Sequence, residues 1–346
     1  MLYVNPLALM YRAFQQPNGG FYKLMRRRMG MYPSTPEKPW RLVLYSDEVV
    51  PGNQLSHDNK RKCWVVYFSW LELGMNALCC EDAWMSMFIA RSSEVATVAA
   101  GMSQIFRELI KTFFGANGHN AATAGVVLVG HDGAQHRLFF DVDMFLQDGG
   151  AHKTVWHCTG DAGSKLCMRC KNLYVEKSGI TDEDGADQLT SSLIHDESIA
   201  FASNEEIRGA VRRLAAHRET DSNAAFKVRE QAIGYRYQPY GILMDRSLDV
   251  TVKPADQFCH DWMHTLLVHG VFNVVVCMLF EQHLKGGMPN VWEHFCGYAA
   301  LYTWPKRVSA SAKSLSETFS EKHEKSSRKA NYLKCQASDA LSLFPV

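Results

Sequence analysis

Three short apolar runs in the N-terminal third constrain the fold of this chain more than any other feature. They are rich in β-branched and aromatic residues and too short for ordinary helices, so each is expected to form a buried strand. The runs are RLVLYSD (41–47), CWVVYFSWLEL (63–73) and WMSMFIA (84–90), with the chain-breaking PGN (51–53) after the first. The sequence therefore predicts a sheet built first from three consecutive strands.

A helix and further strands are expected next. Apolar residues recur at helical spacing between 93 and 114, and Ser93 is the expected N-cap. GVVLVG (125–130) and HRLFFDVDMFLQ (136–147) then read as strands. Strands that alternate with an amphipathic helix indicate an α/β fold with a mixed sheet flanked by helices.

Composition limits the class of protein. A chain of 346 residues with 47% hydrophobic and 21% charged residues can bury a large core and hold more than one domain. The formal charge of +1 excludes a uniformly basic protein. Local basic clusters at 23–28, 60–62 and 306–334 can still contact phosphates, although a solvated surface is the ordinary role of such clusters.

Cysteine usage and hydropathy predict an intracellular protein outside the membrane. The ten cysteines are scattered, and no secretion signal precedes them, so reduced thiols are expected. The most apolar window, 265–280, is short and carries His269 and Asn273. These features favour a buried helix over a membrane span.

Two acids stand where predicted strands end. Asp47 closes the first strand and Asp148 follows the last one. Carboxylates brought together on neighbouring strands could share Mg²⁺ or Mn²⁺ and serve phosphoryl transfer. Taken alone, aspartates at strand ends are more often turn formers or helix caps.

A Cys-x-x-Cys pair supplies half of a zinc site. Cys167 and Cys170 can direct two sulfurs at one ion, and His260 and His264 lie four residues apart further on. Roughly 90 residues separate the halves, too many for a simple zinc finger, so the metal would staple an inserted segment. The alternative is buried free thiols and core histidines.

These residues carry a resemblance to the transposases of the CACTA-like (CMC) cut-and-paste superfamily. LYSDEVVPGNQL resembles the strand with the first catalytic aspartate, and QDGGA resembles the second-aspartate motif, with Gly150 where proline is common. TGDAGSKLCMRC resembles the glycine-rich run into Cys-x-x-Cys, and DWMH (261–264) resembles the D-x-M-H signature. The motifs extend from residue 41 to about 284.

The resemblance implies an RNase H-like mixed sheet with a DDE/D active site and a mostly helical, zinc-stabilised insertion. Asp47 and Asp148, rather than Asp161, would hold catalytic Mg²⁺ or Mn²⁺. Structural Zn²⁺ would bind Cys167, Cys170, His264 and His260. The expected activity is DNA strand cleavage and transfer in DNA recombination.

The resemblance also implies where the protein acts and what it binds. DNA is the expected partner, and a homo-oligomer is expected if the protein is active. In a eukaryote the location would be the nucleus, and no membrane is involved.

One departure concerns the third acid. Relatives carry a glutamate soon after M-H, but here the run is MHTLLVHGVFN, with no acid until Glu281. Asp261 or Glu281 could supply the third carboxylate. If neither does, the chain is a domesticated or inactive copy, a zinc-stabilised module that binds DNA without cutting it. A third hypothesis is an unrelated intracellular enzyme with structural cysteines, in which the two aspartates lie far apart.

Five segments are expected. Residues 1–39 form an N-terminal segment and 40–165 the first part of the core. Residues 166–255 hold the cysteine knuckle and the insertion, which includes an acidic connector at 176–205. Residues 256–304 complete the core and the metal site, and 305–346 form a basic C-terminal segment.

Overall fold

The chain divides into two compact units, Met1–Cys259 and His260–Val346, and each is described by itself. The structure is a computed structural model that describes residues 5–17, 19–50, 61–115, 120–175, 197, 199–304 and 312–343. The expected break at 51–53, most of the acidic connector and the start of the basic C-terminal segment lie outside these residues. The cysteine loop and the insertion belong to the same unit as the sheet.

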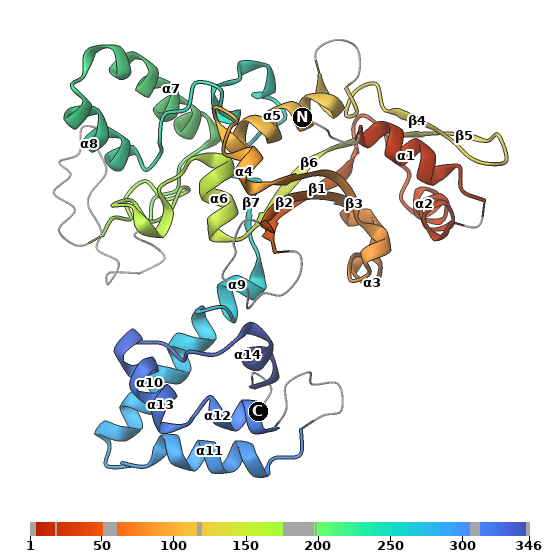
Figure 1. The fold of residues 1–346 in the computed structure, drawn as a ribbon. Helices are drawn as coiled ribbons and strands as arrows, with labels where there is room; N and C mark the ends of the chain where they lie inside the picture. Colours follow the sequence, from red (N-terminus) through yellow and green to blue (C-terminus); the bar gives the residue numbers. More distant parts are fainter. Residues whose placement is uncertain are drawn as a thin grey trace. The chain divides into compact units, whose positions relative to one another are not determined.

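A five-stranded mixed sheet forms the centre of the first unit (Figure 1). Its order is β3-β2-β1-β6-β7, with β1–β2 and β2–β3 antiparallel and β1–β6 parallel. The strands are β1 (Trp40–Val49), β2 (Cys63–Trp70), β3 (Met85–Arg91), β6 (Phe140–Gln147) and β7 (Phe258–His260). The three expected N-terminal strands are confirmed, and the second ends early because Leu71–Leu73 turns into a 3-10 helix.

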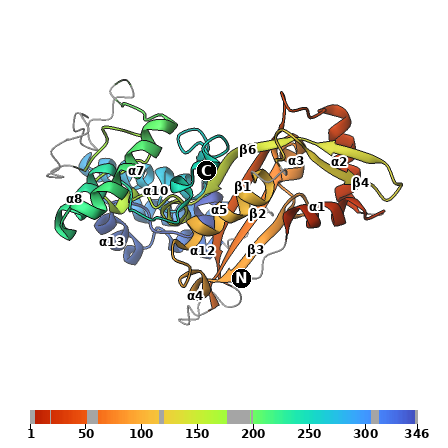
Figure 2. The same ribbon diagram turned by 90° about the horizontal axis from the view of Figure 1, so that it is seen from above.

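The expected strand at 136–147 is two strands. β5 (Gln135–Leu138) pairs with β4 (Val126–Val129) in a separate hairpin, whereas β6 pairs with β1. The backbone changes sheet at Phe139, whose carbonyl accepts the Trp40 N–H at 2.8 Å. Figure 2 shows the hairpin extending beyond the main sheet.

The helix expected at 93–114 is also divided, into α4 (Ser92–Val95) and α5 (Gly101–Phe114). Gly101 has φ 49°, a conformation that suits glycine, and α5 starts there, so Ser93 is not its N-cap. The apolar face of α5 packs on the sheet, with the ring centroids of Phe106 and Phe145 5.7 Å apart. The predicted amphipathic helix against the sheet is confirmed from residue 101 onward.

Further helices cover the first unit. Residues 1–39, expected only as a segment, include two helices, and the Tyr22 hydroxyl ties the second to the β4–β5 turn by donating to Asp132 at 3.0 Å. The helices are α1 (Pro6–Phe14), α2 (Gly20–Met31), α3 (Met75–Leu78), α6 (Gly149–Trp156), α7 (Asn204–Thr220) and α8 (Asn223–Ile233).

The second unit is helical in its described part (Figure 1). Its core is a cluster of buried side chains that includes Phe280, Trp292, Phe319 and Leu333. The helices are α9 (Trp262–Leu266), α10 (Val271–Lys285), α11 (Val291–Leu301), α12 (Ala312–Glu317), α13 (Glu321–Ala330) and α14 (Ala337–Leu343).

The most apolar stretch is neither a buried helix nor a continuous span. Trp262–Lys285 is long and apolar enough to cross a membrane by length and composition alone. It is interrupted before Gly270, and α10 has 15 residues, fewer than the about 20 that a span needs. The expected buried helix is wrong, because only one face of α10 packs inward; Val271 and Met278 are 55% and 64% exposed.

Candidate active site

The register of β1 and β6 places the two strand-end aspartates at one edge of the sheet. Tyr45 pairs with Leu146 and Ser46 with Gln147, and the strands are parallel, so Asp47 and Asp148 each follow the last registered pair. Asp148 follows the end of β6 as expected, whereas Asp47 lies inside β1, two residues before its end at Val49.

A buried side-chain hydrogen bond joins the two strands immediately before the acids. The Gln147 side chain donates its Nε2–H to the Ser46 hydroxyl at 2.7 Å, and both residues are at most 1% exposed. A buried polar pair restricts strand slippage, because any shift would leave its donor without a partner. The hydrogen bond therefore fixes the position of the Asp47 backbone relative to the Asp148 backbone.

The two carboxylates have different local roles. Asp47 lies within β1, half-buried, and accepts a hydrogen bond from the Tyr45 hydroxyl at 3.3 Å. Asp148, also half-buried, is the N-cap of α6 and accepts the Ala151 N–H at 2.6 Å through Oδ1. Asp148 thus has the helix-capping role that is common for an aspartate at a strand end. Its Oδ1 is engaged by the Ala151 N–H.

A cleft of about 560 Å³ lies between α4, α5 and α6, and neither Asp47 nor Asp148 lines it. Glu48, Lys153, His157 and Arg236 contribute its charged and titratable groups together with Cys158. Sequence reasoning did not select Lys153 or His157, although their i, i+4 spacing after Asp148 would put them on one side of a helix. The two cations of the cleft are Lys153, which is paired with Asp161, and Arg236.

Glu48 is held beside the cleft as a carboxylate. It accepts from Lys62 Nζ at 2.8 Å and from the Ser92 hydroxyl at 2.6 Å. Burial alone would raise the pKa of Glu48, but these two hydrogen bonds and the charge of Lys62 outweigh it, and the pKa is lowered. Glu48 thereby links β1 to β2 and to the start of α4.

His157 lies at the end of α6 with φ 53°, and its Nε2 is 3.2 Å from the Ala100 carbonyl. Burial lowers its pKa more than this hydrogen bond raises it, so the neutral imidazole is favoured. Asp161 lies in the turn Gly160–Ala162, exposed and paired with Lys153. It is not at a strand end, in keeping with the choice of Asp148 over Asp161.

Cys167 and Cys170 lie next to each other in the loop that follows this turn. Their side chains share a hydrogen bond, which lowers the pKa of Cys167 to about 6 and raises that of Cys170. The Lys171 N–H donates to the Ala200 carbonyl at 2.6 Å and holds this loop in place. Two adjacent sulfurs fit half of a tetrahedral site.

The remaining predicted residues belong to the second unit. Asp261 caps α9 by accepting the Met263 N–H at 2.9 Å, and its Oδ2 is 2.6 Å from Nδ1 of His264. His260 is exposed at the end of β7. Glu281 binds Arg328 Nε at 2.5 Å. Within the described residues no group of three or more His, Cys, Asp or Glu side chains is arranged to hold a metal ion.

Comparison with known proteins finds no relative of this chain. No family model, curated protein or solved structure matches this chain. The chemistry of the site therefore rests on its own residues: two carboxylates on neighbouring strands, and a paired dithiol and a separate cleft in the same unit.

Proposed function

We propose that this chain is a transposase-derived protein that cuts and joins DNA strands with a DDE/D-type active site. The observation that carries the proposal is the parallel β1–β6 register, which places Asp47 and Asp148 at the same edge of the sheet. An unrelated enzyme in which the two aspartates lie far apart is not favoured by this register.

The strand order supports an RNase H-like core. Three antiparallel strands are followed by a helix and then by a strand parallel to the first, which is the order expected from the resemblance. The β4–β5 hairpin is an addition between that helix and β6. The insertion after Asp148 is helical in α7 and α8, as that reading requires.

Asp47 and Asp148 would hold Mg²⁺ or Mn²⁺, since half-buried carboxylate oxygens are the ligands these ions prefer. When bound, such ions activate a nucleophile and stabilise the leaving oxygen in phosphoryl transfer. The protein's own contribution is positioning: the Ser46–Gln147 hydrogen bond sets the strand ends, and Lys153 and Arg236 attract the phosphate backbone into the cleft.

Structural Zn²⁺ would bind Cys167 and Cys170, completed by His264 and His260. His264 already directs Nδ1 at a carboxylate, the arrangement by which metal-binding histidines are usually oriented. In that role Asp261 positions His264, and Glu281 is the other candidate for the third catalytic acid.

A second candidate is a zinc-stabilised DNA-binding module without catalysis. The contacts of both candidates for the third catalytic acid favour this non-catalytic module. The Asp261 carboxylate caps α9 and contacts His264, and the Glu281 carboxylate binds Arg328. In either case we propose DNA as the partner and a nuclear location in a eukaryote. A homo-oligomer is proposed for the active form.

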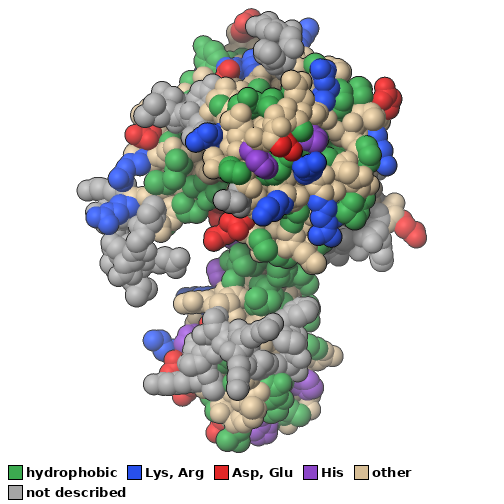
Figure 3. Space-filling model, turned by 90° about the vertical axis from the view of Figure 1, so that its right-hand side faces the viewer, with side chains coloured by type: hydrophobic (Ala, Val, Ile, Leu, Met, Phe, Trp, Pro, Cys, Tyr) green, Lys and Arg blue, Asp and Glu red, His purple; other side chains and the backbone are tan. Residues whose placement is uncertain are grey.

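The surface of the first unit offers a place for DNA. Lys23, Arg26 and Arg27 are exposed on α2. Figure 3 looks onto the side of the first unit where α2 and the hairpin lie and shows Lys and Arg side chains gathered there. Binding through such contacts should weaken steeply as salt rises.

Cleavage of a labelled DNA duplex with Mg²⁺ or Mn²⁺ tests the proposal. Asp47→Asn and Asp148→Asn should each abolish nicking, while Glu219→Gln, at an exposed position on α7, should cleave like the unchanged protein. Equal nicking by all three variants refutes the active site. DNA binding without nicking by the unchanged protein selects the second candidate.

Metal analysis of the full chain tests the zinc assignment separately. Cys167→Ser and Cys170→Ser should each lose zinc, whereas the exposed Cys79→Ser should retain it. Equal zinc content in all of these proteins contradicts the assignment.

A further inference from the structure

One end of the first unit carries a charge that departs from that of the chain. This end consists of α1, α2 and the β4–β5 hairpin, which Figure 2 shows together beyond the main sheet. Its described residues, 5–17, 19–39 and 120–139, contain seven Lys or Arg and two Asp or Glu, so the formal charge is seven minus two, or +5. The whole chain has a formal charge of +1. Positive charge is therefore concentrated on these three elements.

The three elements pack against one another through aromatic rings. The ring centroid of Phe14 on α1 lies 4.9 Å from that of Tyr22 on α2 and 5.5 Å from that of His136 on β5. The Tyr22 ring centroid also lies 4.7 Å from that of His131 in the β4–β5 turn. The charge therefore belongs to one packed substructure rather than to separate loops.

The carboxylate in the turn of the hairpin is already neutralised. Asp132 accepts hydrogen bonds from the Tyr22 hydroxyl at 3.0 Å and from Arg26 Nη1 at 3.3 Å. The charges of Arg26 and Asp132 cancel each other, and both contacts hold the turn against α2. A polyanion that approaches the hairpin would therefore not meet an unpaired acid in this turn.

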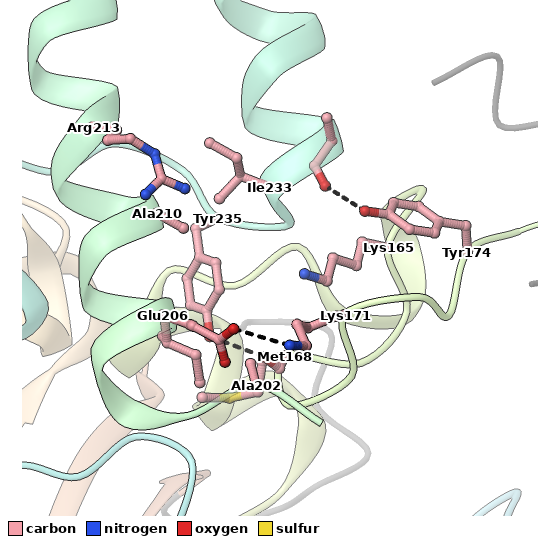
Figure 4. A pocket seen from close by; sticks show the side chains of 12 residues that line it. Lys165, Met168, Lys171, Tyr174, Ala202, Glu206, Ala210, Arg213, Ile233 and Tyr235 are labelled. Carbon is pink, nitrogen blue, oxygen red and sulfur yellow. Dashed lines mark hydrogen bonds and ion pairs between the residues drawn. The ribbon is translucent and has the colours of Figure 1, made fainter. Parts of the chain in front are cut away.

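Three exposed cations of the substructure have no acidic partner among the described residues. They are Lys23 and Arg27 on α2 and Arg137 on β5. Lys171 in the cysteine loop and Arg212 on α7, by comparison, are each bound to a carboxylate. Figure 4 shows the first of these pairs, between Lys171 and a glutamate of α7, beside a small cavity. The three unpaired cations are the ones suited to an outside ligand.

Arg137 is held in a defined orientation. Its Nη1–H donates to the Ala124 carbonyl at 2.9 Å, which is its one hydrogen bond within the described residues. Gly125 has φ 69°, and a Cβ there would lie 2.9 Å from Cγ of Arg137, so glycine leaves room for the arginine stem. The other edge of the guanidinium, Nε and Nη2, remains able to donate two parallel hydrogen bonds to a ligand.

The outer face of the hairpin combines polar and apolar side chains without an acid. The register pairs Val127 with Arg137 and Val129 with Gln135. Side chains alternate along a strand, and Leu128 between the two valines is buried, so these two pairs form the outer face. Val127 is 41% exposed, and Gln135 and Arg137 are exposed as well.

Shape and chemistry together identify the partner. The major groove of DNA is about 12 Å wide and admits a two-stranded ribbon, whereas the minor groove is about 6 Å wide. Arginine pairs with guanine, glutamine with adenine, and an apolar side chain contacts the thymine methyl group. Figure 3 shows Lys and Arg side chains gathered on the side of the unit where α2 and the hairpin lie, as contacts to the flanking phosphates require.

We propose that the outer face of the β4–β5 hairpin enters the major groove of duplex DNA. Arg137 and Gln135 then lie at base edges, and Lys23 and Arg27 contact adjacent phosphates. The choice of DNA rests on the proposed function, whereas the location rests on the charge and shape of this substructure. The hairpin thereby adds recognition of sequence, which phosphate contacts alone do not provide.

The salt dependence of duplex DNA binding by the full chain tests the phosphate contacts. Lys23→Gln and Arg27→Gln should each reduce the slope of log Kobs against log salt by about 1, equally for every sequence. Lys227→Gln, at an exposed position on α8, is the matched control and should keep the slope. Unchanged slopes in the two α2 variants, or an equal change in the control, refute these contacts.

Selection from a random pool of duplexes tests the base contacts. Arg137→Lys keeps the charge but lacks the planar fork, so it should lose about tenfold discrimination at one base pair while its salt slope is unchanged. Gln135→Ala, at an exposed position, should relax the preference at another base pair and remains informative if Arg137→Lys is unstable. If the unchanged protein selects no sequence, or if both variants keep its preference, the reading of the groove is refuted.

Two further measurements separate this proposal from other outcomes. If the unchanged protein binds no duplex DNA, or if polyglutamate displaces the duplex as well as unlabelled DNA does, the surface fits an acidic protein and the proposal is overturned. Far-UV circular dichroism of each variant shows whether the fold is retained. Absence of nicking with the expected losses of slope and preference refutes the catalytic proposal only. Normal nicking with unchanged slopes and preference refutes the hairpin contact only.

Discussion

The buried Ser46–Gln147 hydrogen bond predicts an unusual order of stabilities. Ser46→Ala leaves the Gln147 Nε2 donor buried without its acceptor, and Oε1 of Gln147 already lacks a partner within the described part of the chain. A buried, unsatisfied polar group costs about 1–3 kcal/mol, so we expect Ser46→Ala to destabilise the sheet by about 2 kcal/mol.

Gln147→Leu should destabilise the sheet less than Ser46→Ala does. It removes the hydrogen bond, worth about 1 kcal/mol, but also removes the unpartnered Oε1 from the core. We expect a net loss of at most about 1 kcal/mol. In the double variant both polar groups are gone, so adding Gln147→Leu to Ser46→Ala should restore about 1 kcal/mol or more.

Hydrogen exchange of peptides from β1 and β6 measures this cycle locally, with peptides of the second unit as the internal reference. Local measurement is needed because a chain of two units need not unfold in one transition. A double variant less stable than Ser46→Ala, or additive losses, would refute the reasoning that this pair is a mutually dependent buried contact.

Three further predictions concern other elements. Folding lowers the pKa of Glu48, so its stabilising contribution is present above pH 4.5 and is lost as the pH falls through the folded value. Glu48→Gln should therefore make the stability of the first unit less sensitive to acid. An unchanged pH profile of unfolding would contradict this. Gly270→Ala would bring a Cβ to 2.0 Å from the Thr265 carbonyl oxygen and should cost about 2 kcal/mol or more by hydrogen exchange of α10. The control Gly297→Ala, in open space within α11, should stabilise by about 0.5–1 kcal/mol. Asp249→Asn breaks a two-pronged contact with Arg212 (2.8 and 2.5 Å) and should cost about 1–3 kcal/mol in chemical unfolding, against at most about 0.5 kcal/mol for the exposed Glu219→Gln.

The sheet was predictable because its strands carry their own pattern. Apolar, β-branched and aromatic runs at 41–47, 63–73 and 84–90 identify strands whatever lies next to them. The division of 136–147 was not predictable, because the run is continuous in sequence and the change at Phe139 depends on pairing with β4 and β1. The start of α5 at Gly101 likewise depends on a positive φ that hydrophobic spacing does not reveal.

The candidate site was predictable in its acids but not in its surroundings. Asp148 follows a visible strand and Asp47 lies near the end of another, whereas Lys153, His157 and Arg236 reach the cleft through α6 and a distant loop.

The two neighbours of β6 in the sheet, β1 and β7, also govern the order in which the chain can fold during synthesis. β1, β2 and β3 are consecutive, so they can pair early, but β1 joins β6 across 101 residues, and Gln257, next to β7, bonds to Val142 across 115. Until β7 emerges from the ribosome, β6 is an open edge strand that could pair with another chain. Asp141 and Asp143 lie on that strand, and burial raises the pKa of both in the finished fold. While β6 is still exposed to water these carboxylates are charged. Their charge opposes the pairing of the open β6 edge with another chain before the sheet is complete.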